Sequence, residues 1–191
     1  MCKNKALPPE PPFPEVQSIK PGRFVIRARP LFQPWSPILI ESQESPSIQV
    51  TEQRKGILVS RRIGFCFAIK NSGILFRLLL RREPLWRRGC SLFFPTCTYI
   101  VELTRASQQQ KMESIEISNP GLLERSRLVV GGKELEVEWQ NEEQFTRLVG
   151  REFSILLKLD GDTEFIVDNE TLVCPVIAYA FYVWFTYWES M

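Results

Sequence analysis

The sequence contains no histidine among its 191 residues. The chain therefore lacks the commonest protein metal ligand and the usual general base near neutral pH. Cysteine–lysine or carboxylate-only catalysis is the alternative left open, although no residue spacing points to it. The chain also lacks a phosphate-binding P-loop, a GxSxG elbow, a Rossmann glycine pattern and the cysteine spacing of a zinc site. These absences predict a protein that is not an enzyme and that uses no metal and no cofactor.

The sequence also has few cysteines, a small net charge and no apolar segment at its start. The five cysteines form no CxxC pair, and an odd number cannot complete a disulfide framework within one chain. The net charge of +2 gives the chain no overall attraction to polyanions. The residues after Met1 are polar and proline-rich, unlike a secretory signal. We therefore expect a cytoplasmic protein, or one exported without a signal peptide.

Proline is concentrated near the N-terminus, where ten of the 14 prolines fall within residues 1–46. Because proline fixes φ and has no N–H to donate, this range predicts a largely extended arm with neither helix nor central strand. Within it, residues 23–27 and 38–40 are short enough and apolar enough to be edge strands. A proline-rich ligand for an aromatic groove is the alternative role for the arm.

The rest of the chain alternates apolar and polar residues with the period of two that strands show. Residues 64–69 and 74–78 predict a hairpin around Asn71-Ser72-Gly73, and the alternation recurs at 135–139 and 153–159. No stretch shows a helical period. The sequence therefore predicts an all-β protein, an antiparallel β-sandwich with one buried and one solvated face.

The C-terminal segment 172–188 is apolar and aromatic and carries no charge. Its length is near the lower limit for a membrane helix, so a membrane tail is one interpretation. Cys174-Pro175 and the many β-branched and aromatic residues favour the other interpretation, a buried strand or strand pair.

Three segments between residues 84 and 170 resemble the carbohydrate-recognition domain of galectins. Residues 99–103 match a strand of the F-x-V-x-L type, residues 117–121 (ISNPG) align with H-x-N-P-R, and residues 139–144 (WQNEEQ) align with W-G-x-E-x-R. The resemblance implies a jelly-roll sandwich like that of galectins and concanavalins over residues 84–191. It also implies a β-galactoside site in which Trp139 stacks on the sugar while Asn119 and Glu142 bind its hydroxyls.

The chain departs from the galectin pattern at three polar positions. The motif histidine is replaced by Ile117, the arginine after proline by Gly121, and the last arginine by Gln144. Each lost charge-assisted hydrogen bond is worth about 1.5–3 kcal/mol, so the sugar affinity is expected to be weakened or lost. The register of Trp139 with Leu135 and Val137 is typical of a buried ring, which is the alternative to an exposed sugar platform.

The segment 47–83, with the residues just after it, is basic and β-rich, and it could be part of a degenerate second sandwich. Ten cations and one acid lie between residues 54 and 88, and Arg81, Arg82, Arg87 and Arg88 are the candidate anion-binding residues.

The function expected is carbohydrate binding, with β-galactoside glycans or glycoproteins and a second copy of the chain as partners. The alternative is a non-lectin interaction module for protein, nucleic acid or anionic membrane. No nucleic-acid motif frames the cations, and membrane association is disfavoured.

Overall fold

The computed structural model describes residues 19–27, 37–55, 61–69, 73–81, 97–103, 115–119, 126–158 and 161–189. Over these residues the chain forms 13 strands, one 3-10 helix (η2) and one α-helix. The elements are β1 (Gly22–Ile26), β2 (Ile38–Ser42), β3 (Ile48–Lys55), β4 (Arg61–Ile69), β5 (Gly73–Arg81), β6 (Cys97–Leu103), β7 (Ile115–Asn119), β8 (Arg127–Val130), β9 (Lys133–Leu135), β10 (Glu138–Asn141), β11 (Phe145–Val149), β12 (Phe153–Lys158), β13 (Thr163–Val167), η2 (Glu170–Leu172) and α1 (Val173–Glu189).

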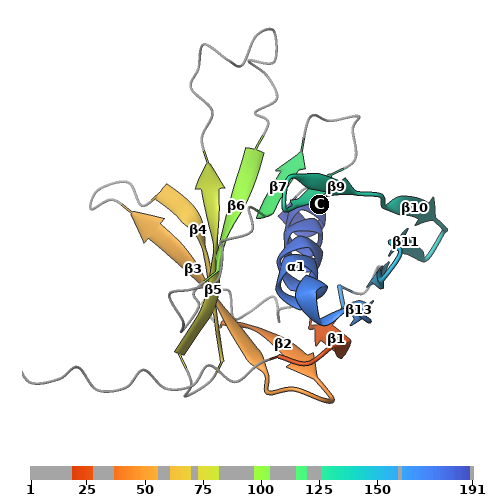
Figure 1. Cartoon of the computed structure of the whole chain (residues 1–191), viewed down its shortest axis with the longest axis horizontal. Coiled ribbons are helices and arrows are strands. Elements are labelled where there is room, and N and C mark those ends of the chain that lie inside the picture. The colour runs from red at the N-terminus through yellow and green to blue at the C-terminus, as the bar shows by residue number, and fades with distance from the viewer. Residues whose placement is uncertain are drawn as a thin grey trace, which may run out of the picture.

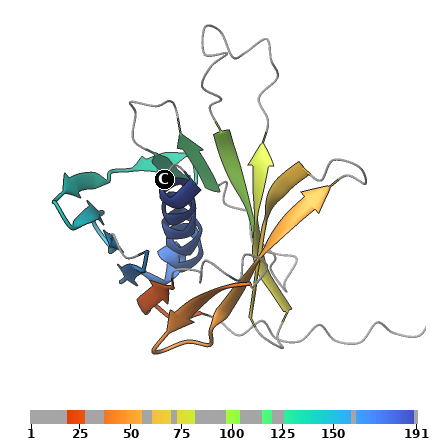
Figure 2. The same cartoon turned by 180° about the vertical axis from the view of Figure 1, so that it is seen from behind.

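The described strands belong to one antiparallel sheet in the order β10-β11-β12-β13-β1-β2-β3-β4-β5-β6-β7-β8-β9. The two strands at the ends of this order follow each other in the chain, joined by Glu136 and Val137 alone. The sheet therefore curves around on itself, and α1 lies inside the curve, between β3–β6 on one side and β10–β13 on the other (Figures 1 and 2).

Alternation along the strands places apolar side chains toward the interior, as the sequence predicts. In β12, Phe153, Ile155 and Leu157 are buried and the residues between them are only half-buried. Phe24 of β1 lies opposite Phe165 of β13, and their rings stack with centroids 5.1 Å apart. The prediction of an all-β, sandwich-like protein is confirmed, with two parts of one sheet facing each other across a helix.

The C-terminal segment is a helix, and the prediction of a buried strand there is wrong. Helix α1 spans Val173–Glu189 and is buried on every side from Val176 to Trp184. A helix that is apolar all round shows no amphipathic period, so the sequence carried no helical signal. Pro175 lies in the first turn, where its missing N–H breaks no helical hydrogen bond. Within the described residues, no helix combines the length and the apolar character needed to cross a membrane.

Two hydrogen bonds fix α1 against the loops that surround it. The Tyr179 hydroxyl donates to the Ser126 carbonyl oxygen at 2.9 Å, and Trp184 Nε1 donates to the Gly161 carbonyl oxygen at 2.9 Å. Burial of its ring raises the pKa of Tyr179 to about 12, because the charged phenolate would lie in an apolar interior. The helix is thus held in register by two bonds from its middle turns.

The N-terminal part of the chain contributes two strands to the sheet. The strands expected at residues 23–27 and 38–40 do form, as β1 and β2. They are not edge strands, because β1 pairs with β13 on one side and with β2 on the other. Both strands lie in stretches free of proline, which leaves their N–H groups available on both sides. Strands from all three expected domain ranges, 1–46, 47–83 and 84–191, belong to the same sheet.

Candidate functional site

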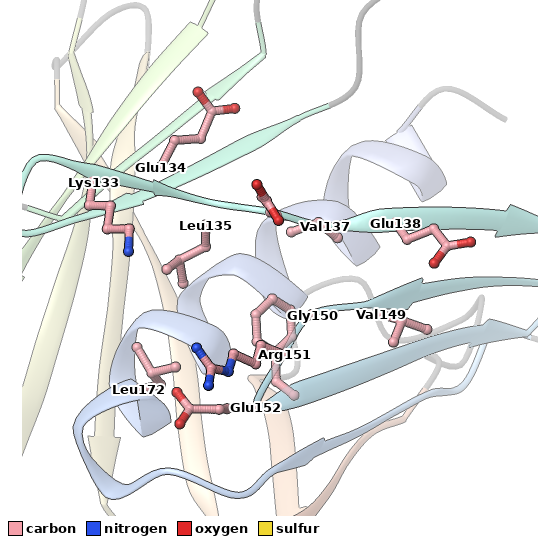
Figure 3. A pocket seen from close by; sticks show the side chains of 12 residues that line it. Lys133, Glu134, Leu135, Val137, Glu138, Val149, Gly150, Arg151, Glu152 and Leu172 are labelled. Atoms are coloured by element: carbon pink, nitrogen blue, oxygen red, sulfur yellow. The ribbon is translucent and has the colours of Figure 1, made fainter.

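A cavity of about 810 Å³ opens where the curved sheet fails to close completely. One wall is the chain from Lys133 to Glu138, and the other is the turn from Val149 to Phe153 (Figure 3). Among the described strands, β9 pairs only with β8 and β10 only with β11, so none of them fills the space between β9 and the β11–β12 turn. Leu172, just before α1, closes the inner end. The volume falls in the range of about 300–1,000 Å³ typical of small-molecule sites.

The floor of the cavity is apolar. Leu135 and Val137 on one wall and Leu172 at its inner end pack against the buried core. The opposite wall carries Phe153, whose ring lies so close to Gly150 that a Cβ at that position would fall 2.4 Å from it. Glycine at this turn therefore lets the Phe153 ring lie against the backbone and line the cavity.

On the wall formed by residues 133–138, the lysine and the glutamates lie on opposite faces. Along 133–138 the side chains alternate, so Lys133 shares a face with Leu135 and Val137 while Glu134, Glu136 and Glu138 point to the opposite face. Figure 3 shows Lys133 directed into the cavity and Glu134 directed away from it.

Three of the four cavity carboxylates already have partners. Glu134 lies 3.7 Å from Arg127 Nε, Glu138 accepts from Gln140 Nε2 at 3.2 Å, and Glu152 accepts from Asn169 Nδ2 at 3.0 Å. Asn169 in turn caps η2 by accepting from the Thr171 N–H. The Glu152 bond therefore ties the wall of the cavity to the segment that leads into α1.

The structure places two of the three predicted sugar-binding residues on one hairpin. Trp139 lies on β10, next to the cavity wall, and its half-buried side chain packs against the core. Glu142 is exposed in the turn that follows, where its N–H donates to the Phe145 carbonyl oxygen at 2.9 Å. Asn119 ends β7, which pairs with β6 and β8 and not with β10. Trp139 and Glu142 are thus neighbours along one segment, and the pairing of β7 does not bring Asn119 to them.

The predicted anion-binding arginines give no structural result. Arg82, Arg87 and Arg88 lie outside the described residues, as does the side chain of Arg81 at the end of β5. Among the residues that the structure does describe, no group of three or more Cys, Asp or Glu side chains is arranged to hold a metal ion.

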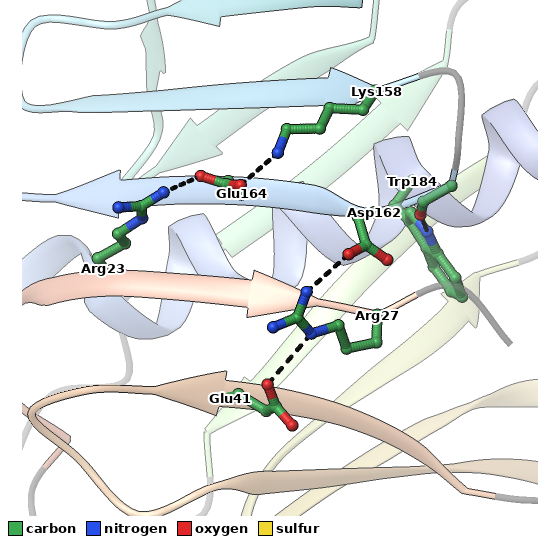
Figure 4. Close-up of polar contacts among 8 residues, drawn as sticks. Arg23, Arg27, Glu41, Lys158, Asp162, Glu164 and Trp184 are labelled. Carbon is green, nitrogen blue, oxygen red and sulfur yellow. Dashed lines mark hydrogen bonds and ion pairs between the residues drawn. The ribbon is translucent and has the colours of Figure 1, made fainter.

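A second, smaller hollow of about 320 Å³ lies on the outer face of β1 and β2. Its cations are already paired, since Arg27 bonds Asp162 at 2.8 Å and Glu41 at 3.2 Å, and Arg23 bonds Glu164 (Figure 4). These contacts join β1 to β2 and to β13 and its preceding turn, so we assign the hollow a structural role.

The same network shifts the protonation of two of its members. Hydrogen bonds from Lys158 and then from Arg23 lower the pKa of Glu164, and bonds to Asp162 and Glu41 raise the pKa of Arg27. Both shifts favour the charged forms that the ion pairs need.

Comparison with protein-family models, curated proteins and solved structures gave no match for this chain. The cavity residues were missed by sequence reasoning, apart from the neighbouring Trp139. The two walls are separated in the chain by β10 and β11, and no motif links them. The signal available in the sequence was an extended segment at 133–141 preceded by a glycine turn. In the structure the first half of this segment pairs with β8 and the second half with β11.

Proposed function

We propose that this protein is a non-catalytic carbohydrate-binding protein and that the cavity between β9 and the β11–β12 turn holds the sugar. The observation that carries the proposal is a cavity of suitable size in which an apolar floor lies beside charged side chains, on the same extended segment as Trp139. No histidine is available for acid–base or metal chemistry, which favours binding over catalysis.

The lining suits a sugar because a pyranose has one face of C–H groups and an edge of hydroxyls. Phe153, Leu135 and Val137 offer apolar surface to the C–H face, and carboxylates at the rim accept hydrogen bonds from hydroxyls. Trp139 would then support the wall from inside and report on occupancy by its fluorescence.

The galectin resemblance supplies the sugar class to test first, a β-galactoside. Trp139, Glu142 and Asn119 are not among the described residues that line the cavity, so the proposal keeps the sugar class that the resemblance implies but not those three contacts. With Ile117, Gly121 and Gln144 in place of the family's polar residues, we expect affinity for lactose in the millimolar range, about −4 kcal/mol.

The test is a titration with lactose, followed by intrinsic tryptophan fluorescence, with sucrose as the control sugar. We expect a saturable change specific to lactose that is lost in Trp139→Phe, a variant that keeps an aromatic ring against the core. Filling the cavity with Val137→Phe should weaken binding at least about tenfold by removing space for the sugar. Ile166→Phe, which also introduces an aromatic ring, at a residue of β13 that is 43% exposed on the outer face, is the control. Folded protein that gives a flat response to lactose, or that binds it equally well with Val137→Phe, would exclude the proposal.

A further inference from the structure

Two cations line the cavity without a partner. Lys133 and Arg151 make no ion pair and no hydrogen bond to any part of the chain that the structure describes. They come from opposite walls, Lys133 from the start of β9 and Arg151 from the β11–β12 turn, and both side chains extend toward the space between the walls (Figure 3). Leu135 and Leu172 line the same cavity, so apolar surface is present beside the two charges.

Within the described residues, the neighbouring carboxylates form no ion pair with these cations. Glu134, Glu136 and Glu138 alternate to the other face of their segment. Glu152 is next to Arg151 in the chain and keeps its negative charge, and its carboxylate accepts a hydrogen bond from the neutral amide of Asn169. Lys133 and Arg151 are therefore cations directed into the cavity, while three of its four glutamates lie on the opposite face of the Lys133–Glu138 wall.

The start of α1 adds to the positive potential at the same end of the cavity. Leu172 lines the cavity and Val173 begins the 17-residue helix, so the positive end of the helix dipole lies beside the inner wall. This contribution is small compared with two full charges, but it has the same sign. An anionic group placed between Lys133 and Arg151 would meet three favourable features at once.

We propose that the ligand of this cavity is an acidic carbohydrate whose carboxylate lies between Lys133 and Arg151. This inference rests on the proposed function and narrows its substrate class. The planar guanidinium of Arg151 can bond both oxygens of a carboxylate, and the Lys133 ammonium can approach from the other wall. The apolar floor beside them would accept the C–H face of the sugar ring that carries the acid.

The test compares a disaccharide of galacturonate with the matching disaccharide of galactose, which differ only in the carboxylates. Isothermal titration of the full chain should show at least about tenfold tighter binding of the acidic sugar at low salt, and added salt should reduce that advantage. Lys133→Gln with Arg151→Gln should remove the preference, so that the variant binds the acidic and the neutral disaccharide with equal affinity. Arg147→Gln, a charge removal at an exposed residue of β11 outside the cavity, is the matched control. Thermal melts should show that all variants remain folded.

The outcomes separate this inference from the function on which it rests. Equal binding of the two disaccharides, with no effect of the double variant, would overturn the acidic preference and leave sugar binding intact. If neither disaccharide binds folded protein, both proposals fail. Sodium sulfate is a third titrant, and binding of sulfate as tight as that of the acidic disaccharide would show an anion site with no role for the sugar, which also overturns the inference.

Discussion

Replacing Phe181 by alanine tests whether α1 is the centre of the core. Phe181 is fully buried, and its ring lies 4.8 Å from that of Phe65 and 5.1 Å from that of Phe67, both on β4. Removing a buried phenylalanine costs about 3–5 kcal/mol, and edge-to-face ring contacts add about 0.5–1.5 kcal/mol each beyond area burial. With two such contacts we expect a loss near the upper end, about 4–5 kcal/mol. That is a large part of the 5–15 kcal/mol by which domains are ordinarily stable.

The assay is urea denaturation followed by far-ultraviolet circular dichroism. Because Phe181→Ala could unfold the protein outright, Phe181→Leu provides a second point, with an expected cost of about 1–2 kcal/mol. Leu39→Ala is the control, since Leu39 is 45% exposed on β2 and should cost less than about 0.5 kcal/mol. If Phe181→Ala and Leu39→Ala change the free energy of unfolding equally, the helix does not occupy the interior and the fold described above is incorrect.

Two further predictions concern the outer ion pairs and a close backbone contact. A carboxyl whose pKa is lowered by folding adds stability above its unfolded pKa of 4.5, and this stability is lost as pH falls through the folded pKa. Glu164→Gln should therefore cost about 0.5–1 kcal/mol at neutral pH and nothing in strong acid. Thermal melts across pH measure this difference. Lys158 is the first cause of that shift, and its removal should flatten the same pH profile. Gly64→Ala would place a Cβ 2.2 Å from the Leu78 carbonyl oxygen and should cost more than about 3 kcal/mol in denaturant unfolding. Gly132→Ala, where φ is +79° but the space is open, should cost only about 1–2 kcal/mol.

The strands could be predicted from sequence wherever one face of the sheet is buried and the other is solvated. Residues 153–157 alternate as expected, and the two strands predicted at 64–69 and 74–78 pair as β4 and β5, with a register shift after Phe67. Asn71 and Ser72 of the predicted turn lie outside the described residues. The turn at Gly131-Gly132 also forms, with positive φ at both residues. In each case the signal is local, because an alternating strand or a glycine turn is determined by a few neighbouring residues.

The helix could not be predicted by the same reasoning, because its environment is apolar on all sides. Periodicity detects a difference between faces, and α1 has almost none between Val176 and Trp184. Its β-branched and aromatic residues then favoured a strand. Tertiary packing overrides that local preference, since the rings of Phe181 and Phe185 both contact Phe65 across the interior.

The candidate site was only partly predictable for a related reason. Trp139 and Glu142 stood out as residue types that bind sugars, and they lie on one hairpin beside the cavity. Lys133 and Arg151 carried no signal, because a single cation in a strand or a turn is ordinary in any surface. The two side chains line one cavity only because the sheet curves and brings the β9 segment opposite the β11–β12 turn.

The most direct test of the proposed site is a map of backbone amide chemical shifts during a titration with lactose, recorded on isotopically labelled protein. The account predicts that the shifts which move are confined to residues 133–139, 149–153 and the start of α1, and that they move together with one dissociation constant. Shifts that stay fixed up to the solubility limit of the sugar, or that move only on the outer face of β1 and β2, would contradict it.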